Sequence, residues 1–486
     1  MKALRLSMFM LIMALLSGIV SPLAMAAPYD SYNYSVWEDS VPSPASYLPS
    51  KVITGDQLTI GQLKGPSDLF VSKNGTIYIA DTGNQRIVVL NSNWKVIRTI
   101  NQFDHDGKPD LFNKPTGLFV KEDGTIYVAD YENQRVVLLN GEGQYLRQID
   151  HPKSDVLASD FVFNPVKLSV DRAGRVYVVA KGVFEGIMQF DDQGAFIGYI
   201  GTNTITPNPA DYFWKVISTK AQRAQMNLFV PTEFTNMDID EKGFLFATNI
   251  DKTTDAPIKR LNPSGKDVLK RFGNFTVSGD LVFSILDGDR AGTSQFIDIK
   301  STVEGSYYAL DSLRGRIFTY DQEGNLLYIF GEIGSRAGTF KTPVAIDKVG
   351  EKVLVLDGGT GRITVFEPTL FGMKVNEATR LHEAGKEQEA SKAWEKVLQL
   401  NANYDIAYIG IGKAQLREQD YKSAMRSFEL GVDRKYYSIA FARDRKQWMR
   451  AHMGEVLTYI VLLAAVIAAW RIFILIRSRR SVTHEA

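Results

Sequence analysis

The sequence predicts a mainly β protein with an α appendage: a six-bladed β-propeller, then a short helical domain and one C-terminal transmembrane helix. Three observations predict this order. A strand-rich unit recurs six times before residue 370, residues 373–450 change to helical periodicity, and residues 456–476 form an apolar run. Units of four short strands repeated about every 50 residues are typical of propeller blades.

The composition fits a globular protein and excludes several kinds of site. Of 486 residues, 45% are hydrophobic and 23% are charged, as in ordinary folded domains. There is no cysteine, so disulfides, thiolate nucleophiles and cysteine-bound zinc are excluded. Residues 28–370 hold 35 basic and 42 acidic residues, a formal charge of −7, which gives no electrostatic support for binding nucleic acid.

Residues 1–26 are predicted to be a secretory signal peptide. Lys2 and Arg5 precede an apolar stretch, and residues 24–26 read Ala-Met-Ala, with small residues at the two positions that a signal peptidase recognises. We therefore expect cleavage before Ala27, with an uncleaved N-terminal anchor as the alternative. Residues 27–46 are expected to form an N-terminal linker.

The repeated unit has a strand led by proline, a glycine turn, a second strand, a polar turn that ends in Arg or Lys, and a third strand. Pro66–Leu90 and Pro115–Leu139 are its clearest copies. Their strands are rich in β-branched and aromatic residues and are bounded by turn residues. The residues that end the six second strands lie 46–69 positions apart: Asp81, Asp130, Ala180, Asn249, Asp311 and Asp357.

The sixth copy lacks a fourth strand of its own, because the chain leaves it at Pro368 toward a helical region. The segment Tyr47–Thr54 lies just before the first copy and has no other partner. We expect this segment to pair as the outer strand of the last blade and to close a propeller that spans residues 47–370. Such pairing would cover an otherwise open sheet edge.

These repeats resemble the NHL-repeat family of six-bladed propellers over roughly residues 60–368. The match to the signature Gly-x-x-Tyr-Val-Ala-Asp-x-x-x-x-Arg is strongest at Gly75–Arg86 and Gly124–Arg135, and the third to fifth copies depart from it. We interpret the polar turn residues as structural, because Asp and Asn bond local backbone at turns and Arg can pair with the Asp. These turn residues are Asp81, Asn84, Arg86, Asp130, Asn133, Arg135, Asp311, Arg316, Asp357 and Arg362.

An insertion between the third and fourth copies is predicted to be helical over residues 207–226. Asn208 suits an N-cap and Pro209 the first helical turn, and an apolar stripe follows them. This helix either shapes a binding site on a propeller face or merely packs there.

Residues 373–450 resemble about two tetratricopeptide (TPR) repeats. Ala390 and Ala424 lie 34 positions apart, as do Trp394 and Phe428, and 34 is the period of that family. Ala402 stands where the family usually has proline. The resemblance implies a protein-interaction module, and a stalk that holds the propeller off the membrane is the alternative.

Residues 456–476 are predicted to span a membrane. They carry one charge, Arg471, and 21 helical residues cover about 30 Å, the thickness of a bilayer core. The tail at residues 477–486 has three arginines among its first four residues, Arg477, Arg479 and Arg480, which favours a cytoplasmic C-terminus. Together with the signal peptide, this places residues 28–455 on the extracytoplasmic side of the cell membrane.

Six-bladed relatives include calcium-dependent lactonases of the gluconolactonase type, in which carboxylates and amides of the innermost strands hold the metal. Counting seven residues back from each turn glycine gives equivalent positions in this chain. They are Asp68, Gly117, Lys167, Asn236 and Asp298, with Val344 or Ala345 in the sixth copy.

Asp68, Lys167, Asn236 and Asp298 are therefore our candidate binding residues in the central channel. Asp68, Asn236 and Asp298 could offer oxygen ligands to Ca²⁺, although the ammonium group of Lys167 would compete for the same carboxylates. The spacing supports no Ser-His-Asp or paired-carboxylate arrangement, so no catalytic residue is predicted.

The sequence favours a binding protein over an enzyme. We expect a membrane-anchored, extracytoplasmic scaffold that recognises a protein, peptide or glycan, for example a membrane protein complex, and that needs no cofactor. The alternative is a gluconolactonase-like, calcium-dependent lactone hydrolase.

Overall fold

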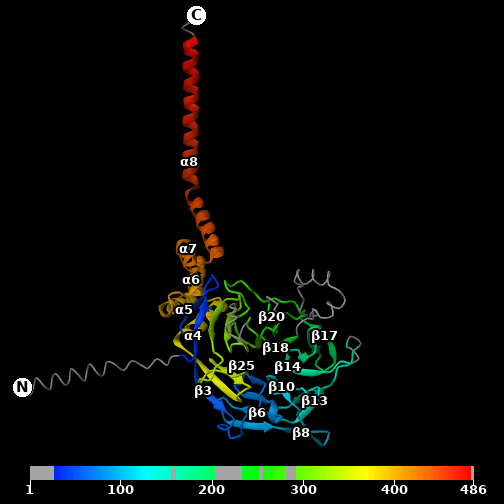
Figure 1. Ribbon diagram of the computed structural model, residues 1–486. Coiled ribbons are helices and arrows are strands. Elements are labelled where there is room, and N and C mark those ends of the chain that lie inside the picture. The colour runs from blue at the N-terminus through cyan, green and yellow to red at the C-terminus, as the bar shows by residue number, and fades with distance from the viewer. Residues whose placement is uncertain are drawn as a thin grey trace, which may run out of the picture. The chain divides into compact units, whose positions relative to one another are not determined.

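The computed structural model describes residues 27–154, 157, 160–202, 233–250, 256–280 and 292–482 (Figure 1). The chain divides into two compact units, Met1–Thr379 and Arg380–Ala486. The predicted signal peptide, the predicted helical insertion at residues 207–226 and the last four residues of the basic tail lie outside the described residues.

Within the described residues of the first unit, six antiparallel sheets of three or four strands follow one another along the chain, which confirms the predicted six-bladed β-propeller (Figure 1). The first three blades have four strands each. From the channel outward they are β4 (Asp68–Val71), β5 (Ile77–Asp81), β6 (Arg86–Leu90) and β7 (Val96–Ile100); β10 (Pro115–Val120), β11 (Ile126–Asp130), β12 (Arg135–Leu139) and β13 (Tyr145–Ile149); and β14 (Asn164–Val170), β15 (Val176–Lys181), β16 (Ile187–Phe190) and β17 (Phe196–Ile200).

The fourth blade has three strands within the described residues, and the last two blades have four. They are β18 (Phe234–Ile239), β19 (Leu245–Asn249) and β20 (Ile258–Leu261); β21 (Phe296–Ser301), β22 (Ser306–Asp311), β23 (Ile317–Asp321) and β24 (Leu326–Phe330); and β25 (Pro343–Val349), β26 (Lys352–Asp357), β27 (Arg362–Pro368) and β3 (Tyr47–Thr54).

The apolar core of the propeller lies between blades rather than inside them. One cluster of buried side chains joins the first and second blades and includes Ile87 and Ile100 of the first blade and Val128 of the second. Similar clusters join each later pair up to the fifth blade, and another joins the sixth blade to the first. Both faces of most strands are therefore buried, which explains why runs such as Ile77–Asp81 are almost wholly apolar.

The ring is closed by a strand from the start of the described chain. β3 pairs antiparallel with β27, with Tyr47 opposite Pro368 and Thr54 opposite Arg362. This is the pairing that the sequence predicts for Tyr47–Thr54, and it fixes the first and last parts of the propeller to each other.

The segment at residues 27–46, expected as a linker, holds two short strands, β1 (Tyr32–Tyr34) and β2 (Ser40–Pro42). They pair with each other, and β1 packs on β24, the outer strand of the fifth blade. The hydroxyls of Tyr32 and Tyr34 both donate to Oδ1 of Asp280, at 2.6 and 2.8 Å. The side-chain amide of Asn33 donates to the carbonyl of Leu327 in the outer strand of this blade.

The first α-helix within the described residues is α4 (Leu370–Glu383), directly after β27. Its first part belongs to the propeller unit, where Asn376 accepts a hydrogen bond from the Tyr328 hydroxyl and donates one to the Tyr47 hydroxyl. These three side chains tie the closing strand, the fifth blade and the helix together.

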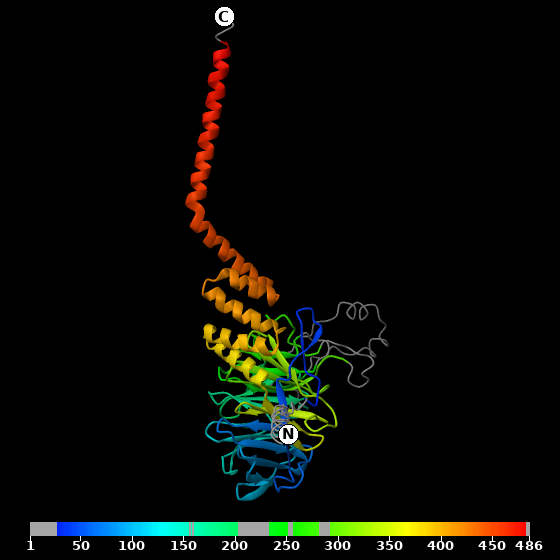
Figure 2. The ribbon, with the colours of Figure 1, turned by 90° about the vertical axis from the view of Figure 1, so that its left-hand side faces the viewer.

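The second unit contains α5 (Glu387–Leu400), α6 (Asp405–Arg417), α7 (Tyr421–Leu430) and α8 (Arg434–Val482), and Figure 2 shows its short helices side by side. Trp394 of α5 packs against Gly410 of α6, and Phe428 of α7 against Gly412, so the two glycines allow close approach. The tetratricopeptide-like assignment of this region stays a prediction.

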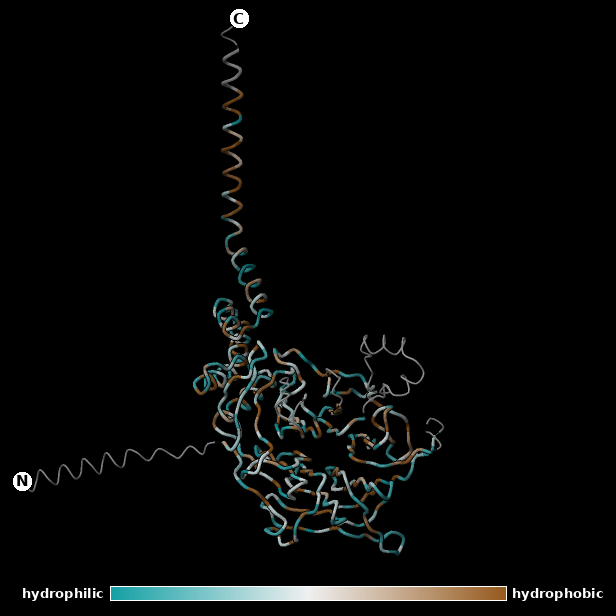
Figure 3. The backbone as a smooth tube through the Cα atoms, in the orientation of Figure 1, coloured by the Kyte–Doolittle hydropathy of each residue, from teal (hydrophilic) through white to brown (hydrophobic). Residues whose placement is uncertain are grey.

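The helix α8 contains the predicted membrane span. It is long and apolar enough to cross a bilayer, and the side chains of its most apolar stretch are exposed. Figure 3 shows hydrophobic residues along one continuous stretch of α8. This fits a helix whose apolar surface is covered by lipid.

Candidate functional site: the central channel and its mouth

Strand register places the candidate residues at one level of the channel. Lys167, Asn236 and Asp298 each follow a bulge in the innermost strand of their blade. The equivalent residue in the sixth blade is Ala345, which settles the choice between Val344 and Ala345. Together with Asp68 and Gly117, these residues form the level that we call the first ring.

Asp68 and Lys167 form a buried ion pair in the first ring. The ammonium Nζ of Lys167 lies 2.6 Å from Oδ1 of Asp68. Asp68 also accepts the backbone N–H of Leu69 at 2.9 Å and that of Leu118, in the next blade, at 2.7 Å. Burial disfavours the charge on Lys167, but Asp68 and Asp298 outweigh burial and raise the Lys167 pKa.

Asp298 is the first-ring residue of the fifth blade, and its carboxylate also binds backbone groups. Its carboxylate accepts the N–H of Ile299 at 2.8 Å and that of Ile346, in the next blade, at 2.6 Å. Burial raises the pKa of Asp298 to about 7, although the Lys167 ammonium opposes the shift. Its charge is therefore only partly present at neutral pH.

The last candidate, Asn236, turns its side-chain oxygen toward its own strand. Asn236 Oδ1 accepts the N–H of Met237 at 2.6 Å. Position 117 has room only for glycine, because a Cβ there would collide with the backbone of Val166 and Lys167.

The first ring does not fit Ca²⁺. Calcium takes six to eight oxygen ligands, whereas Asp68 and Asp298 already bind backbone N–H groups and a lysine ammonium. The cavity beside them has a volume of about 10 Å³, the space of about one water molecule. Among the residues that the structure describes, no cluster of three or more acidic or histidine side chains could hold a metal ion.

A second ring lies two residues further along each innermost strand, and our sequence analysis missed it. The same counting rule, moved by two positions, would have found it. Its members are Phe70, Phe119, Ser169, Asp238, Lys300 and Asp347, all of which line the small cavity.

The ammonium group of Lys300 lies near both carboxylates of the second ring. Its Nζ lies 3.5 Å from Oδ1 of Asp238 and 3.4 Å from Oδ1 of Asp347, and 5.4 Å from the centre of the Phe70 ring. Burial disfavours the ammonium, but the two carboxylates outweigh burial and raise the Lys300 pKa. Burial raises the pKa of Asp347, and Lys300 opposes that shift.

Four channel carboxylates share one arrangement: each accepts an N–H from the innermost strand of the next blade. Asp68 reaches the second blade and Asp298 the sixth, as described above. Asp238 accepts the N–H and the hydroxyl of Ser301, and Asp347 accepts the N–H of Val71 at 2.8 Å. These carboxylates therefore join blade to blade around the channel.

Beyond the second ring the channel widens into a pocket of about 320 Å³, which we call the mouth pocket. It lies among the turns that join the first and second strands of four blades. Its wall combines apolar, hydroxyl and charged side chains, and the residues on which the argument below depends are Val71, Lys73, Glu241, Thr302, Val303 and Glu304.

Charged side chains at the mouth pair across blades. Lys73 of the first blade lies 2.6 Å from Glu122 of the second and 3.6 Å from Glu241 of the fourth. All three side chains are largely exposed, and hydrogen bonding to Glu122 raises the pKa of Lys73. Such exposed pairs are weak and exchange readily with a charged ligand.

The repeated polar turns have contacts of a different kind. In the first blade, Asp81 accepts the N–H of Lys64, the amide of Asn84 and Nε of Arg86, at 2.7–2.8 Å. In the second blade, Asp130 makes the corresponding contacts with Asn113, Asn133 and Arg135. These contacts hold each turn against the segment that precedes its blade.

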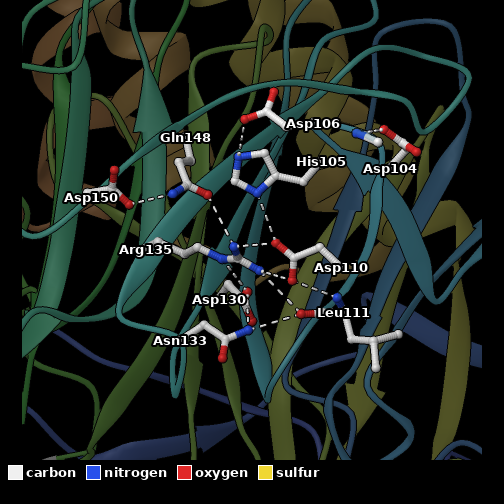
Figure 4. Close-up of polar contacts among 11 residues, drawn as sticks. Asp104, His105, Asp106, Asp110, Leu111, Asp130, Asn133, Arg135, Gln148 and Asp150 are labelled. Carbon is white, nitrogen blue, oxygen red and sulfur yellow. Dashed lines mark hydrogen bonds and ion pairs between the residues drawn. The ribbon is translucent and has the colours of Figure 1, made fainter.

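Arg135 also holds an additional hairpin, β8 (Gln102–His105) and β9 (Lys108–Leu111), as Figure 4 shows. Its two terminal nitrogens contact the two carboxylate oxygens of Asp110 at 2.6 and 3.0 Å. This guanidinium lowers the pKa of Asp110 to about 2. Asp110 also lies 3.2 Å from Nδ1 of His105, and Arg135 contacts Gln148 at 3.1 Å.

The turns of the fifth and sixth blades differ from this pattern. Asp311 accepts the N–H groups of Gln295 and Leu313, while Arg316 donates to the carbonyls of Asp30 and Gly331. Burial raises the pKa of Asp311 to about 6.

In the sixth blade, Asp357 accepts the N–H groups of Lys341, Thr342 and Gly359, and Arg362 is exposed. The acidic residue therefore keeps its backbone role in every turn described here, while the role of the arginine changes.

Comparison with known proteins identifies the repeats. Residues 63–90 and 112–137 match the NHL repeat. The chain contains NHL repeats. These two NHL repeats lie in the first three strands of the first two blades, where the repeated turns have the same contacts. A search of curated proteins finds no match.

Solved structures similar to the NHL-repeat propeller include virginiamycin B lyase from Staphylococcus aureus, with 12% identity, 65% of this chain and 98% of that chain covered, and a TM-score of 0.40. They also include the β-propeller domain of Cps50 (Swd1) from Myceliophteria thermophila, with 10% identity, 66% and 100% covered, and a TM-score of 0.39. Similarity this distant carries no functional argument.

Proposed function

We propose that this protein is a membrane-anchored, extracytoplasmic binding protein that holds a protein, peptide or glycan partner at the mouth pocket. The proposal rests on one observation: the inner rings and the mouth of the same channel differ in open space and in side-chain bonding. The two inner rings are filled and paired, whereas the mouth pocket offers about 320 Å³. Pockets of roughly 300–1,000 Å³ are typical of ligand sites.

The chemistry of the mouth pocket supports recognition rather than catalysis. Val71 and Val303 offer apolar contact, Thr302 offers a hydroxyl, and Glu304 pairs with Lys348 at 3.0 Å. Burial disfavours the Glu304 carboxylate, but Lys348 outweighs burial and lowers the Glu304 pKa. Apolar surface with a few placed charges suits a partner of mixed character.

The location follows from the predicted signal peptide and from α8. A helix that crosses the membrane once, after an exported N-terminal part, holds the propeller outside the cytoplasm and its last residues inside. Protease added to intact spheroplasts should then degrade the propeller and leave a tag after residue 486 intact. Protection of the propeller would contradict this orientation.

Site-specific photo-crosslinking in native membranes tests the binding site. A photoreactive amino acid at position 303 reports on the mouth, because the Val303 side chain is highly exposed there. The same group at position 97 is the matched control, since Ile97 is an exposed residue on the outer strand of the first blade.

We expect a discrete adduct from position 303 and none of the same mass from position 97. The variant Val349→Trp, which fills the pocket, should remove that adduct while thermal melting followed by circular dichroism stays close to wild type. Equal adducts from both positions, or an adduct that survives the filled pocket, would contradict the proposal.

A further inference from the structure

The first part of α8 carries large apolar side chains that its own unit leaves uncovered. Tyr436, Ile439 and Ala440 pack against α7, but Phe441 is 49% exposed and Trp448 is 55% exposed. These two residues lie seven positions apart and therefore share one face of the helix. Exposed aromatic side chains on a helix of a folded unit indicate a binding surface.

Basic residues surround this apolar face. Between residues 443 and 450 the chain has four basic residues and one acidic residue, Asp444. The basic side chains are exposed, and they are Arg443, Arg445, Lys446 and Arg450. Tryptophan beside basic residues is typical of helices that lie in the headgroup layer of a membrane, where aromatic rings and cations both find favourable surroundings.

The same helix continues into the apolar run at residues 456–476. Trp448 precedes that run by eight residues, or about 12 Å along a straight helix. The headgroup layer on each side of a bilayer is only about 5–7 Å thick, so a helix continuing straight along the bilayer normal would hold Trp448 in water.

In the structure, α8 is not a straight helix. Figures 1 and 2 both show α8 bent partway along its length, between its orange and red parts. At the start of the apolar run, the hydroxyl of Thr458 donates to the carbonyl of Gly454 at 2.8 Å. Back-bonding of this kind tends to bend helices, and glycine weakens them.

We propose that the segment Phe441–Met453 lies in the headgroup layer of the extracytoplasmic leaflet and binds anionic phospholipid headgroups. Its continuity with the membrane span and its excess of basic residues favour lipid over a protein partner. The inference rests on α8 crossing the membrane, and it is independent of what the mouth pocket binds.

The absence of cysteine from the chain allows a clean test. In the full-length variant Trp448→Cys, an apolar environment-sensitive fluorophore attached to the new thiol takes the place of the indole. Lys422→Cys, at an exposed position of α7, is the matched control. Both proteins are reconstituted in vesicles of phosphatidylcholine alone or with phosphatidylglycerol added.

We expect spin-labelled lipid to quench most of the emission at position 448 in vesicles with phosphatidylglycerol, less in phosphatidylcholine, and little at position 422. Adding Arg443→Glu and Lys446→Glu should return the phosphatidylglycerol value toward that of phosphatidylcholine. Equal quenching in both vesicles would overturn the anionic-headgroup assignment.

A fluorophore at position 448 that is as open to aqueous iodide as the one at position 422 would overturn the proposal altogether. So would a probe that is shielded in native membranes but open to iodide in the reconstituted vesicles, because a protein partner would then cover the helix.

Discussion

Inside the channel, carboxylates and lysines are buried: the carboxylates bind the backbone of the neighbouring blade, and the lysines bind the carboxylates. At the mouth, a few residues further along the chain, Lys73 is exposed and pairs with the exposed carboxylates of Glu122 and Glu241. The pair Asp68–Lys167 shows the first case and Lys73–Glu241 the second. The residue types and their spacing are similar in these two pairs. Burial and backbone partners therefore decide which charged side chains stabilise the propeller and which are accessible to a ligand.

The largest effect should come from breaking the buried pair in the first ring. Asp68→Ala leaves the Lys167 ammonium without its nearest carboxylate and also frees the N–H of Leu118. We expect a loss of about 3–5 kcal/mol in the free energy of unfolding, because one partner of a buried ion pair remains uncompensated. Chemical denaturation of the full-length protein in detergent measures this loss.

The double variant Asp68→Ala with Lys167→Met is the matched control. Removing both charges should recover part of the stability that the single variant loses, since no buried charge is left alone. If single and double variants are equally destabilised, the ion pair is not what connects these blades.

A smaller loss is expected at the anchor of the β8–β9 hairpin. Arg135→Ala removes contacts to Asp110, Asp130 and Gln148 and should cost about 1.5–3 kcal/mol, the range for hydrogen bonds to charged groups. Thermal or chemical unfolding measures the loss, and limited proteolysis should show earlier cleavage within residues 102–111.

Arg86→Ala in the first blade is the control, because Arg86 binds Asp81 and the carbonyl of Ile60 but holds no hairpin carboxylate. Its loss should be about 1 kcal/mol smaller. Equal losses would show that the Asp110 contact adds nothing to stability.

Much of the fold could be predicted from the sequence because each repeat contains its own strands and turns. Counting from the turn glycine even found the level of Asp68 and Asp298, and the unpaired strand Tyr47–Thr54 indicated the closure. These signals are local, or they repeat.

The missed features depend on contacts that no spacing reveals. The N-terminal strands were expected as linker, yet Tyr32 and Tyr34 bind Asp280, almost 250 residues away. The partners of the channel carboxylates are backbone N–H groups of the next blade, which have no residue type to recognise. The positions of candidate metal ligands could therefore be predicted from the sequence. It could not be predicted that these carboxylates join one blade to the next.

The buried carboxylate of Asp298 should make stability depend on pH. Its pKa is raised to about 7 in the folded protein, from about 4 in the unfolded chain, so the folded state binds more protons in between. Its contribution to the free energy of unfolding is therefore greatest below about pH 4 and falls as the pH rises toward about 7. Other buried carboxylates add similar slopes, so the useful quantity is a difference between variants.

Unfolding of wild type and Asp298→Asn across this pH range isolates that difference. The variant loses one backbone contact, which lowers stability at every pH, but it cannot titrate. We expect the stability of wild type to fall more steeply with pH than that of Asp298→Asn. Parallel curves would show that Asp298 keeps an ordinary pKa in the folded protein.

The smallest effect on stability is expected at the mouth. Lys73→Ala removes exposed pairs with Glu122 and Glu241, which are screened by salt, so the unfolding midpoint should stay within the error of the measurement. The crosslinked adduct from position 303 should nevertheless decrease, because Lys73 lines the mouth pocket. Lys51→Ala, an exposed residue on the closing strand, should change neither quantity. A destabilised Lys73→Ala with unchanged crosslinking would place Lys73 among the charges that hold the blades together, and would remove the distinction between mouth and inner channel.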